Sequence, residues 1–174
     1  RDNRLTVDDV WARARRQFEA NRPGPARITL AALPVSQAVD AKALDKIIDS
    51  PMAYLAKQPA GWSGSRSGRE LTALAIQRVA ANDPRAAAAE LEKLQGRMKD
   101  SERQWAWSQL GLQAAKRHYS EALDWYALAA DTPLSDEGAQ WKVRAALRAH
   151  DWSVVLATIN AMPPTLAAQP EWVY

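Results

Sequence analysis

Two histidines and two adjacent acidic pairs carry most of the reactive side chains in this sequence. His118 and His150 are the only histidines among its 174 residues, and neither belongs to a cluster with metal-ligand spacing. Both fall near the expected ends of helices, where the helix dipole favours a positive charge. We therefore expect both histidines to be structural, and we expect no metal.

The acidic pairs, Asp8-Asp9 and Asp136-Glu137, are of a type that could serve acid–base chemistry on a glycosidic bond. Each pair falls in an expected first helical turn, where acidic residues are favoured in any case. A catalytic carboxylate pair is thus left open but unsupported. The sequence has no Ser, His and Asp grouping, no P-loop and no dinucleotide-binding fingerprint. No cofactor is expected.

The Gly- and Ser-rich segment at 61–67 holds the best candidates for ligand contacts. Arg66 lies between two glycines in what should be the longest flexible stretch, and it could contact an anion. Of the eight tryptophans, Trp62 is the one expected to be exposed, with a flat face suited to a sugar. We predict Trp62, Arg66 and Arg69 as ligand-binding residues.

A repeat of about 34 residues fills the second half of the chain. Ser67, Ser101 and Ser135 stand 34 apart, each just before an Ala-rich amphipathic stretch, and such a period is typical of a helix-pair solenoid. Residues 34 positions apart occupy equivalent places in successive repeats, and each such set is called a column here. We expect the columns to be buried, and the last column to let facing helices approach closely. The columns are Leu91, Trp125 and Ile159; Leu94, Leu128 and Met162; Ala88, Ala122 and Leu156; Trp107 and Trp141; Gly111 and Ala145.

Helix-start signals and chain breaks divide the sequence into short helices, and no stretch alternates long enough to predict a sheet. We expect a helix from Thr6 to Asn21, a break at 21–25, and a last helix that opens at Pro170. Between them, helices are expected at about 26–33, 41–49, 51–58, 68–81, 84–97, 102–117, 120–130, 136–149 and 152–161, the last closed by Pro163 and Pro164.

These helices predict an all-α fold, a right-handed α-superhelix or solenoid of tetratricopeptide-like helix pairs. Residues 1–66 would form an irregular helical segment of the superhelix. Residues 67–174 would form the regular repeats, truncated in the last unit.

Composition is that of a globular chain, with 47% hydrophobic residues and a net charge of +3. No apolar run approaches the roughly 18 residues that cross a bilayer, so no membrane span is expected. The positive charges are dispersed; the densest group, Arg13, Arg15 and Arg16, has Glu19 close by and favours a solvated helix face. The absence of cysteine fits an oxidising compartment and also the cytosol. Because residue 1 is Arg, we expect the gene product to start upstream.

One unit resembles a tetratricopeptide repeat. Its first-helix pattern and its second-helix spacing are present, although one residue is missing between the two halves. The matching residues are Trp107, Leu110 and Gly111, followed by Ala122, Tyr126 and Ala129.

A second resemblance covers most of the chain. The stretch 144–164, with its arginine-rich helix, its Asp151-Trp152 turn and its Met162-Pro163 break, continues into Trp172-Val-Tyr174. This series, and the helix opening at 5–13, is similar to the superhelical region of soluble lytic murein transglycosylases.

That resemblance implies a periplasmic enzyme that cuts peptidoglycan between N-acetylmuramic acid and N-acetylglucosamine and leaves an anhydromuramoyl end. The family's catalytic Glu, followed by Ser, belongs to a lysozyme-like domain C-terminal to the superhelix. No glutamate of this chain is followed by Ser, so we assign no catalytic residue. The chain is expected to be a scaffold that meets glycan strands through the full-length protein and contacts its own catalytic domain.

Two other functions compete with this one. The tetratricopeptide-like unit would also suit an adaptor that binds a protein or peptide partner and has no link to the cell wall. Nucleic-acid binding by helical repeats needs paired specificity residues at fixed positions, whereas these columns are apolar. We therefore rank it last and expect no nucleic acid.

Overall fold

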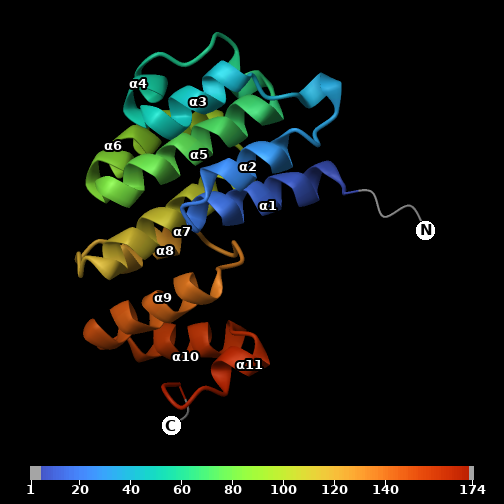
Figure 1. The fold of residues 1–174 in the computed structure, drawn as a ribbon. Coiled ribbons are helices and arrows are strands. Elements are labelled where there is room, and N and C mark those ends of the chain that lie inside the picture. The colour runs from blue at the N-terminus through green and yellow to red at the C-terminus, as the bar shows by residue number, and fades with distance from the viewer. Residues whose placement is uncertain (1–4, 173–174) are drawn as a thin grey trace. The chain divides into compact units, whose positions relative to one another are not determined.

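The computed structural model describes residues 5–172, and in that range every regular element is a helix. The predicted all-α class is confirmed. The chain divides into two compact units, Arg1–Ala106 and Trp107–Tyr174, within which neighbouring helices pack in pairs (Figure 1). The predicted division at residue 66 separates an irregular segment from the regular repeats, and it stays a prediction. No helix in the described range is both long enough and apolar enough to cross a membrane.

The first unit is built around one long buried helix, α5 (Arg66–Asn82). Helices α1, α3, α4 and α6 all pack against it, and α2 packs against α1. The bounds are α1 Val7–Glu19, α2 Pro23–Leu30, α3 Ala41–Asp49, α4 Pro51–Ala56 and α6 Pro84–Leu94, with 3-10 turns at η1 Val35–Gln37, η2 Trp62–Gly64 and η3 Gln95–Arg97.

Side-chain caps begin these helices largely where the sequence predicts. Thr6 accepts from the Asp9 backbone N–H at 3.1 Å while the Asp9 carboxylate accepts from the Thr6 N–H at 3.0 Å, a complete capping box. The side chains of Asp40, Asp83, Ser135 and Asp151 cap α3, α6, α9 and α10 by accepting one backbone N–H each, without the reciprocal bond of a capping box.

Prolines open more helices than expected. The predicted break at 21–25 is wrong in its second half, because Pro23 occupies the first position of α2. Pro163 and Pro164 follow the end of α10 as predicted, and Pro164 in addition opens a short helix, α11 (Pro164–Ala167). Proline tolerates this position because a first-turn N–H has no intrahelical partner to lose.

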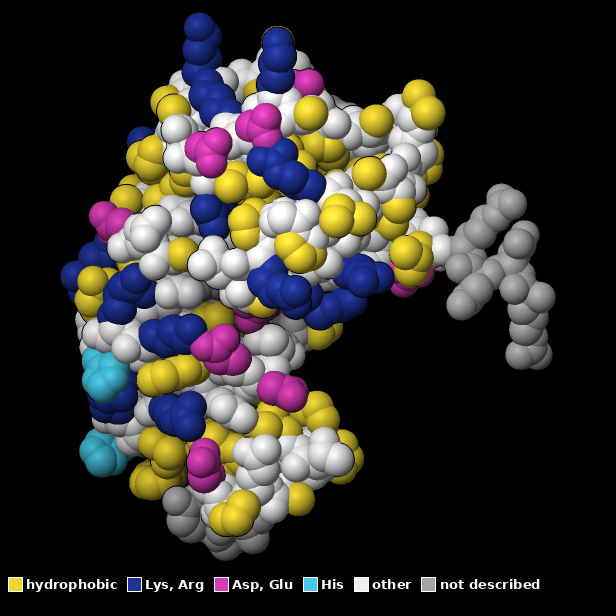
Figure 2. Space-filling view, in the orientation of Figure 1, with side chains coloured by type: hydrophobic (Ala, Val, Ile, Leu, Met, Phe, Trp, Pro, Cys, Tyr) yellow, Lys and Arg dark blue, Asp and Glu magenta, His cyan; other side chains and the backbone are white. Residues whose placement is uncertain are grey.

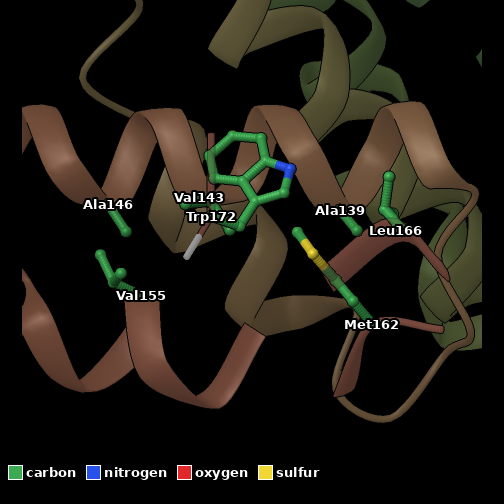
Figure 3. Close-up of a cluster of buried hydrophobic side chains, with 7 residues drawn as sticks. All are labelled: Ala139, Val143, Ala146, Val155, Met162, Leu166 and Trp172. Carbon is green, nitrogen blue, oxygen red and sulfur yellow. The ribbon is translucent and has the colours of Figure 1, made fainter. Parts of the chain in front are cut away.

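The second unit contains the end of α7 (Asp100–Lys116), then α8 (Ala122–Leu128), α9 (Asp136–Arg148), α10 (Trp152–Ala161) and α11. Helix α9 packs against α8 and α10. A core of seven buried residues lies between α9, α10 and the chain beyond α10, where Trp172 lies against α9 beside Val143 (Figure 3). Residues 168–172 form turns rather than the predicted helix opening at Pro170; Val173 and Tyr174 lie outside the described residues.

The 34-residue register holds between α6 and α8 and shifts by one residue at α10. Ala88, Leu91, Ala122 and Trp125 are all buried as predicted. In α10, however, Val155 and Thr158 are buried, whereas Leu156 is 62% exposed. The link at 149–151 is shorter than the link at 117–121, and one residue turns a helix face by about 100°.

The other columns are partly confirmed. Met162 and Trp107 are buried, but Leu128 is half exposed, and Leu94 and Trp141 are only partly buried.

Two backbone features confirm local predictions. Gly111 faces the Tyr126 ring so closely that a Cβ at this position would lie 2.8 Å from Cγ of Tyr126, which is the close approach expected there. His118 and His150 end α7 and α9 in the left-handed conformation, with φ of 60° and 55°. After each histidine, the backbone N–H of the next residue donates to the carbonyl five residues before it at 2.9 Å. This carbonyl belongs to Ala114 in α7 and to Ala146 in α9, and the hydrogen bond closes the helix.

A charged cleft as the candidate functional site

A cleft of about 530 Å³ in the first unit is lined mostly by charged side chains. It lies at the N-terminal ends of α5 and α7, beside α1, and it includes two of the three predicted ligand-binding residues. Its lining residues are Asp8, Trp11, Ala12, Arg15, Arg66, Arg69, Glu70, Lys99, Ser101 and Glu102.

Glu70 is the most buried charge of the cleft, with 1% of its surface exposed. The Arg15 guanidinium binds it with two nearly parallel hydrogen bonds, 2.6 Å to Oε1 and 2.9 Å to Oε2. Arg66 approaches the same Oε1 at 3.7 Å. Burial raises the pKa of the Glu70 carboxyl, and Arg15 opposes this shift in part.

Arg69 forms a second ion pair in the cleft. Its Nε donates to Oε1 of Glu102 at 2.7 Å, and its Nη1 donates to the carbonyl of Ser63 at 2.9 Å. Arg69 and Glu102 are 7% and 2% exposed, so a ligand cannot reach this arginine without displacing its partners. The predicted contact role of Arg69 gains no support from this position.

Arg66 is the more accessible of the two predicted arginines, with about a third of its side chain exposed. It is ion-paired with Asp8 of α1 and approaches Glu70. Any ligand would have to compete with those carboxylates for its guanidinium.

The expectation that Trp62 is exposed is wrong. The Gly- and Ser-rich segment folds into the turn η2, where Trp62 is 6% exposed and the Arg97 guanidinium lies over its ring at 4.9 Å. Close backbone packing produces this burial, since a Cβ on Gly68 would lie 2.0 Å from the Trp62 carbonyl oxygen. The segment is therefore part of the fold rather than a flexible linker, because α5 already begins at Arg66.

The chemistry open to this cleft is limited by its own ion pairs. A general acid must present a proton to its substrate, yet both oxygens of Glu70 accept hydrogen bonds from Arg15. Glu102 is likewise committed to Arg69. The two ion pairs hold α1, α5 and the start of α7 together within the first unit. Neither of these two glutamates is free to act as a general acid or base.

The other reactive residues are separate from this cleft. Asp136 and Glu137 occupy the first turn of α9, where Glu137 pairs with Lys116. His118 and His150 are exposed at helix ends. Residues 5–172 contain no cluster of His, Cys, Asp and Glu that could hold a metal ion. Lys and Arg side chains are spread over the face in Figure 2, with Asp and Glu between them, as the sequence predicts.

Sequence reasoning missed both buried ion pairs, which join residues 55 and 33 positions apart. A signal did exist in the sequence. Arg69 and Glu70 directly precede the apolar run of α5, where a charged residue enters the core only with a partner. The partner itself could not be read from the sequence, since nothing local pairs Arg15 with Glu70.

Comparisons with known proteins give one kind of match. No protein-family model matches the sequence, and no curated protein sequence matches it either. Among solved structures, the chain is similar to an inactive mutant of the lytic transglycosylase Slt from Pseudomonas aeruginosa, with a TM-score of 0.63 and 25% sequence identity. The match covers 97% of this chain and 27% of that chain, so this chain spans about a quarter of the protein that it matches. At the level of the fold, the chain is similar to part of a lytic transglycosylase.

Proposed function

We propose that this chain is a non-catalytic helical scaffold of a periplasmic lytic transglycosylase that acts on peptidoglycan. The observation that carries the proposal is the structural match to Slt, at 25% identity over 97% of the chain. The sequence series Asp151-Trp152, Met162-Pro163 and Trp172 supports it independently. In the fold, these residues cap α10, end it and close the core against it.

The state of the carboxylates supports the scaffold role. Cleavage of a glycosidic bond needs an acid positioned to protonate the leaving oxygen. The two buried glutamates of the cleft are held in ion pairs, and no glutamate of the chain is followed by Ser as in the family's catalytic motif. The catalytic acid would come from the C-terminal lysozyme-like domain, and this chain would supply a rigid helical support beside it.

The test is to incubate purified sacculi with the full-length gene product and, separately, with this chain alone. Soluble products are then analysed by mass spectrometry for anhydromuramoyl ends. We expect them from the full-length protein and none from the chain alone. Products from neither would overturn the proposal. Products from the chain alone would contradict its non-catalytic role.

A second candidate function is a tetratricopeptide-like adaptor for a protein partner. The packing of Gly111 against Tyr126 favours it, because those residues belong to the repeat pattern seen in the sequence. The sacculus experiment separates the two functions, since an adaptor unrelated to the cell wall would yield no anhydromuramoyl product in either sample.

A further inference from the structure

A cavity of about 350 Å³ lies in the second unit, between the loop that joins α8 to α9, helix α9 and helix α10. One part of its lining is an apolar wall that includes Val154, Ala157 and Met162. Its charged lining consists of Lys142 within α9, Asp136 at the start of α9 and Asp131 of the loop. The cavity therefore presents charges of both signs beside an apolar wall.

Lys142 is a partly buried cation without a carboxylate partner. Its Nζ lies 5.8 Å from the centre of the Tyr126 ring, and no carboxylate within residues 5–172 forms an ion pair with it. Burial lowers the pKa of the Lys142 ammonium. Since a charge that leaves water without a counter-ion costs free energy, the site favours an anionic group beside this ammonium.

The two acidic residues of the cavity limit what that anionic group can belong to. Asp131 and Asp136 are exposed, and neither forms an ion pair in the part of the chain that the structure describes. A ligand with negative charge alone would be attracted by Lys142 and repelled by both carboxylates, and a cation would meet the reverse. A ligand that carries both charges can gain from each side.

The spacing of the charges indicates the size of such a ligand. Asp136 and Lys142 are six residues apart in α9, which separates their Cα atoms by about 9 Å along the helix axis. A free amino acid carries both charges on one Cα, whereas a dipeptide separates its charged ends by one further residue, about 3.5 Å. The spacing therefore favours a dipeptide over a single amino acid, and the apolar wall favours an aliphatic side chain on it.

We propose that this cavity binds a zwitterionic dipeptide, with its carboxylate on Lys142, its ammonium on Asp136 and an aliphatic side chain against the apolar wall. The inference goes beyond the proposed function and does not rest on it, because every residue that carries it lies in the second unit and none takes part in cell-wall chemistry.

The test uses L-alanyl-L-leucine as the probe and acetylation of Lys142 in the full-length gene product as the readout. Trace labelling with acetic anhydride at pH 7, followed by peptide mass spectrometry, gives the rate at each lysine with and without the dipeptide. We expect saturating dipeptide to slow acetylation of Lys142 about tenfold, because a bound carboxylate favours the unreactive ammonium form. Lys42, an exposed lysine of α3 outside the cavity, should react at the same rate in both samples.

Two derivatives separate the roles of the ligand's charges. L-Alanyl-L-leucine amide lacks the carboxylate and should give no protection. N-Acetyl-L-alanyl-L-leucine lacks the ammonium and should need about a tenfold higher concentration for half-maximal protection. Equal potency of the N-acetyl derivative would overturn the proposal, because the cavity would then bind a plain carboxylate. The absence of protection by the dipeptide itself would also overturn it.

Asp136→Asn tests the partner of the ammonium. Asp136 is exposed and Ser135 caps α9, so the substitution leaves the helix start intact. It should raise the half-maximal concentration of the dipeptide about tenfold and leave that of the N-acetyl derivative unchanged. Asp124→Asn, at an exposed position of α8 outside the cavity, is the matched control and should change neither value. An Asp136→Asn variant that binds the dipeptide as tightly as the unsubstituted protein would contradict the proposal.

Discussion

Glu70 is almost completely buried and is also ion-paired. Its titration tests whether burial or the ion pair has the larger effect on the pKa of its carboxyl. Burial raises the pKa of its carboxyl above the ordinary value of 4.5, which the unfolded chain should retain. Between those two pKa values the folded protein binds more protons than the unfolded chain, so stability falls as pH rises. The contribution of Glu70 is fully present below the unfolded pKa and is lost as pH rises through the folded pKa.

Glu70→Gln removes this titration and keeps the shape of the side chain. We expect the unfolding free energy of the unsubstituted protein, minus that of Glu70→Gln, to grow as pH is lowered from about 8 to about 4. Urea unfolding at several pH values measures this difference. A difference that shrinks on acidification would mean that Arg15 lowers the pKa of Glu70 more than burial raises it.

At the scale of the elements, helix starts could be predicted because a cap is a local interaction. Asp40, Asp83 and Asp151 each sit directly before the helix that their side chain caps, so the sequence contains the whole motif. The shift of burial from Leu156 to Val155 could not be predicted in the same way. The shift depends on the length of the turn between α9 and α10. The 34-residue spacing of the serines that mark the repeat does not reveal the length of each turn inside a repeat.

The candidate site was less predictable than the helices. Arg66 and Arg69 both line the cleft, but their ion-pair partners, Asp8 and Glu102, come from other helices and could not be predicted. Trp62 shows the same difficulty, because a Gly- and Ser-rich segment suggests a mobile loop. The burial of that residue instead depends on contact with Gly68 and Arg97, which only the folded chain brings together.

The end of α8 offers a test of helix termination. Ala130 has φ of 49°, a left-handed conformation that a Cβ disfavours by about 1 kcal/mol and that glycine adopts freely. We expect Ala130→Gly to raise the unfolding free energy by about 0.5 kcal/mol, after the greater freedom of glycine in the unfolded chain is subtracted. Ala127→Gly, at an exposed position inside α8, should lower it by about 1 kcal/mol. Thermal and urea unfolding of both variants measure the pair, and a loss of stability in both would contradict the assignment of a left-handed helix end.

At the scale of the whole molecule, one helix passes through the boundary between the two compact units. Helix α7 begins at Asp100 in the first unit and ends at Lys116 in the second. Because helix formation is cooperative along the chain, we expect unfolding of one unit to fray α7 and destabilise the other. The two units should therefore unfold in one transition.

Two matched glycine substitutions test this coupling. A Cβ on Gly68 would lie 2.0 Å from the Trp62 carbonyl oxygen in the first unit, and a Cβ on Gly111 would lie 2.8 Å from the Tyr126 ring in the second. Gly111→Ala should cost about 1–3 kcal/mol through overpacking, and Gly68→Ala at least as much, because its Cβ would meet backbone atoms rather than a side chain. Gly96→Ala is the control, because no atom lies within 4 Å of the added Cβ. Calorimetry should show Gly68→Ala and Gly111→Ala shifting the same single transition to lower temperature. If each substitution instead shifted a different one of two transitions, α7 would not couple the units, and each unit would fold separately.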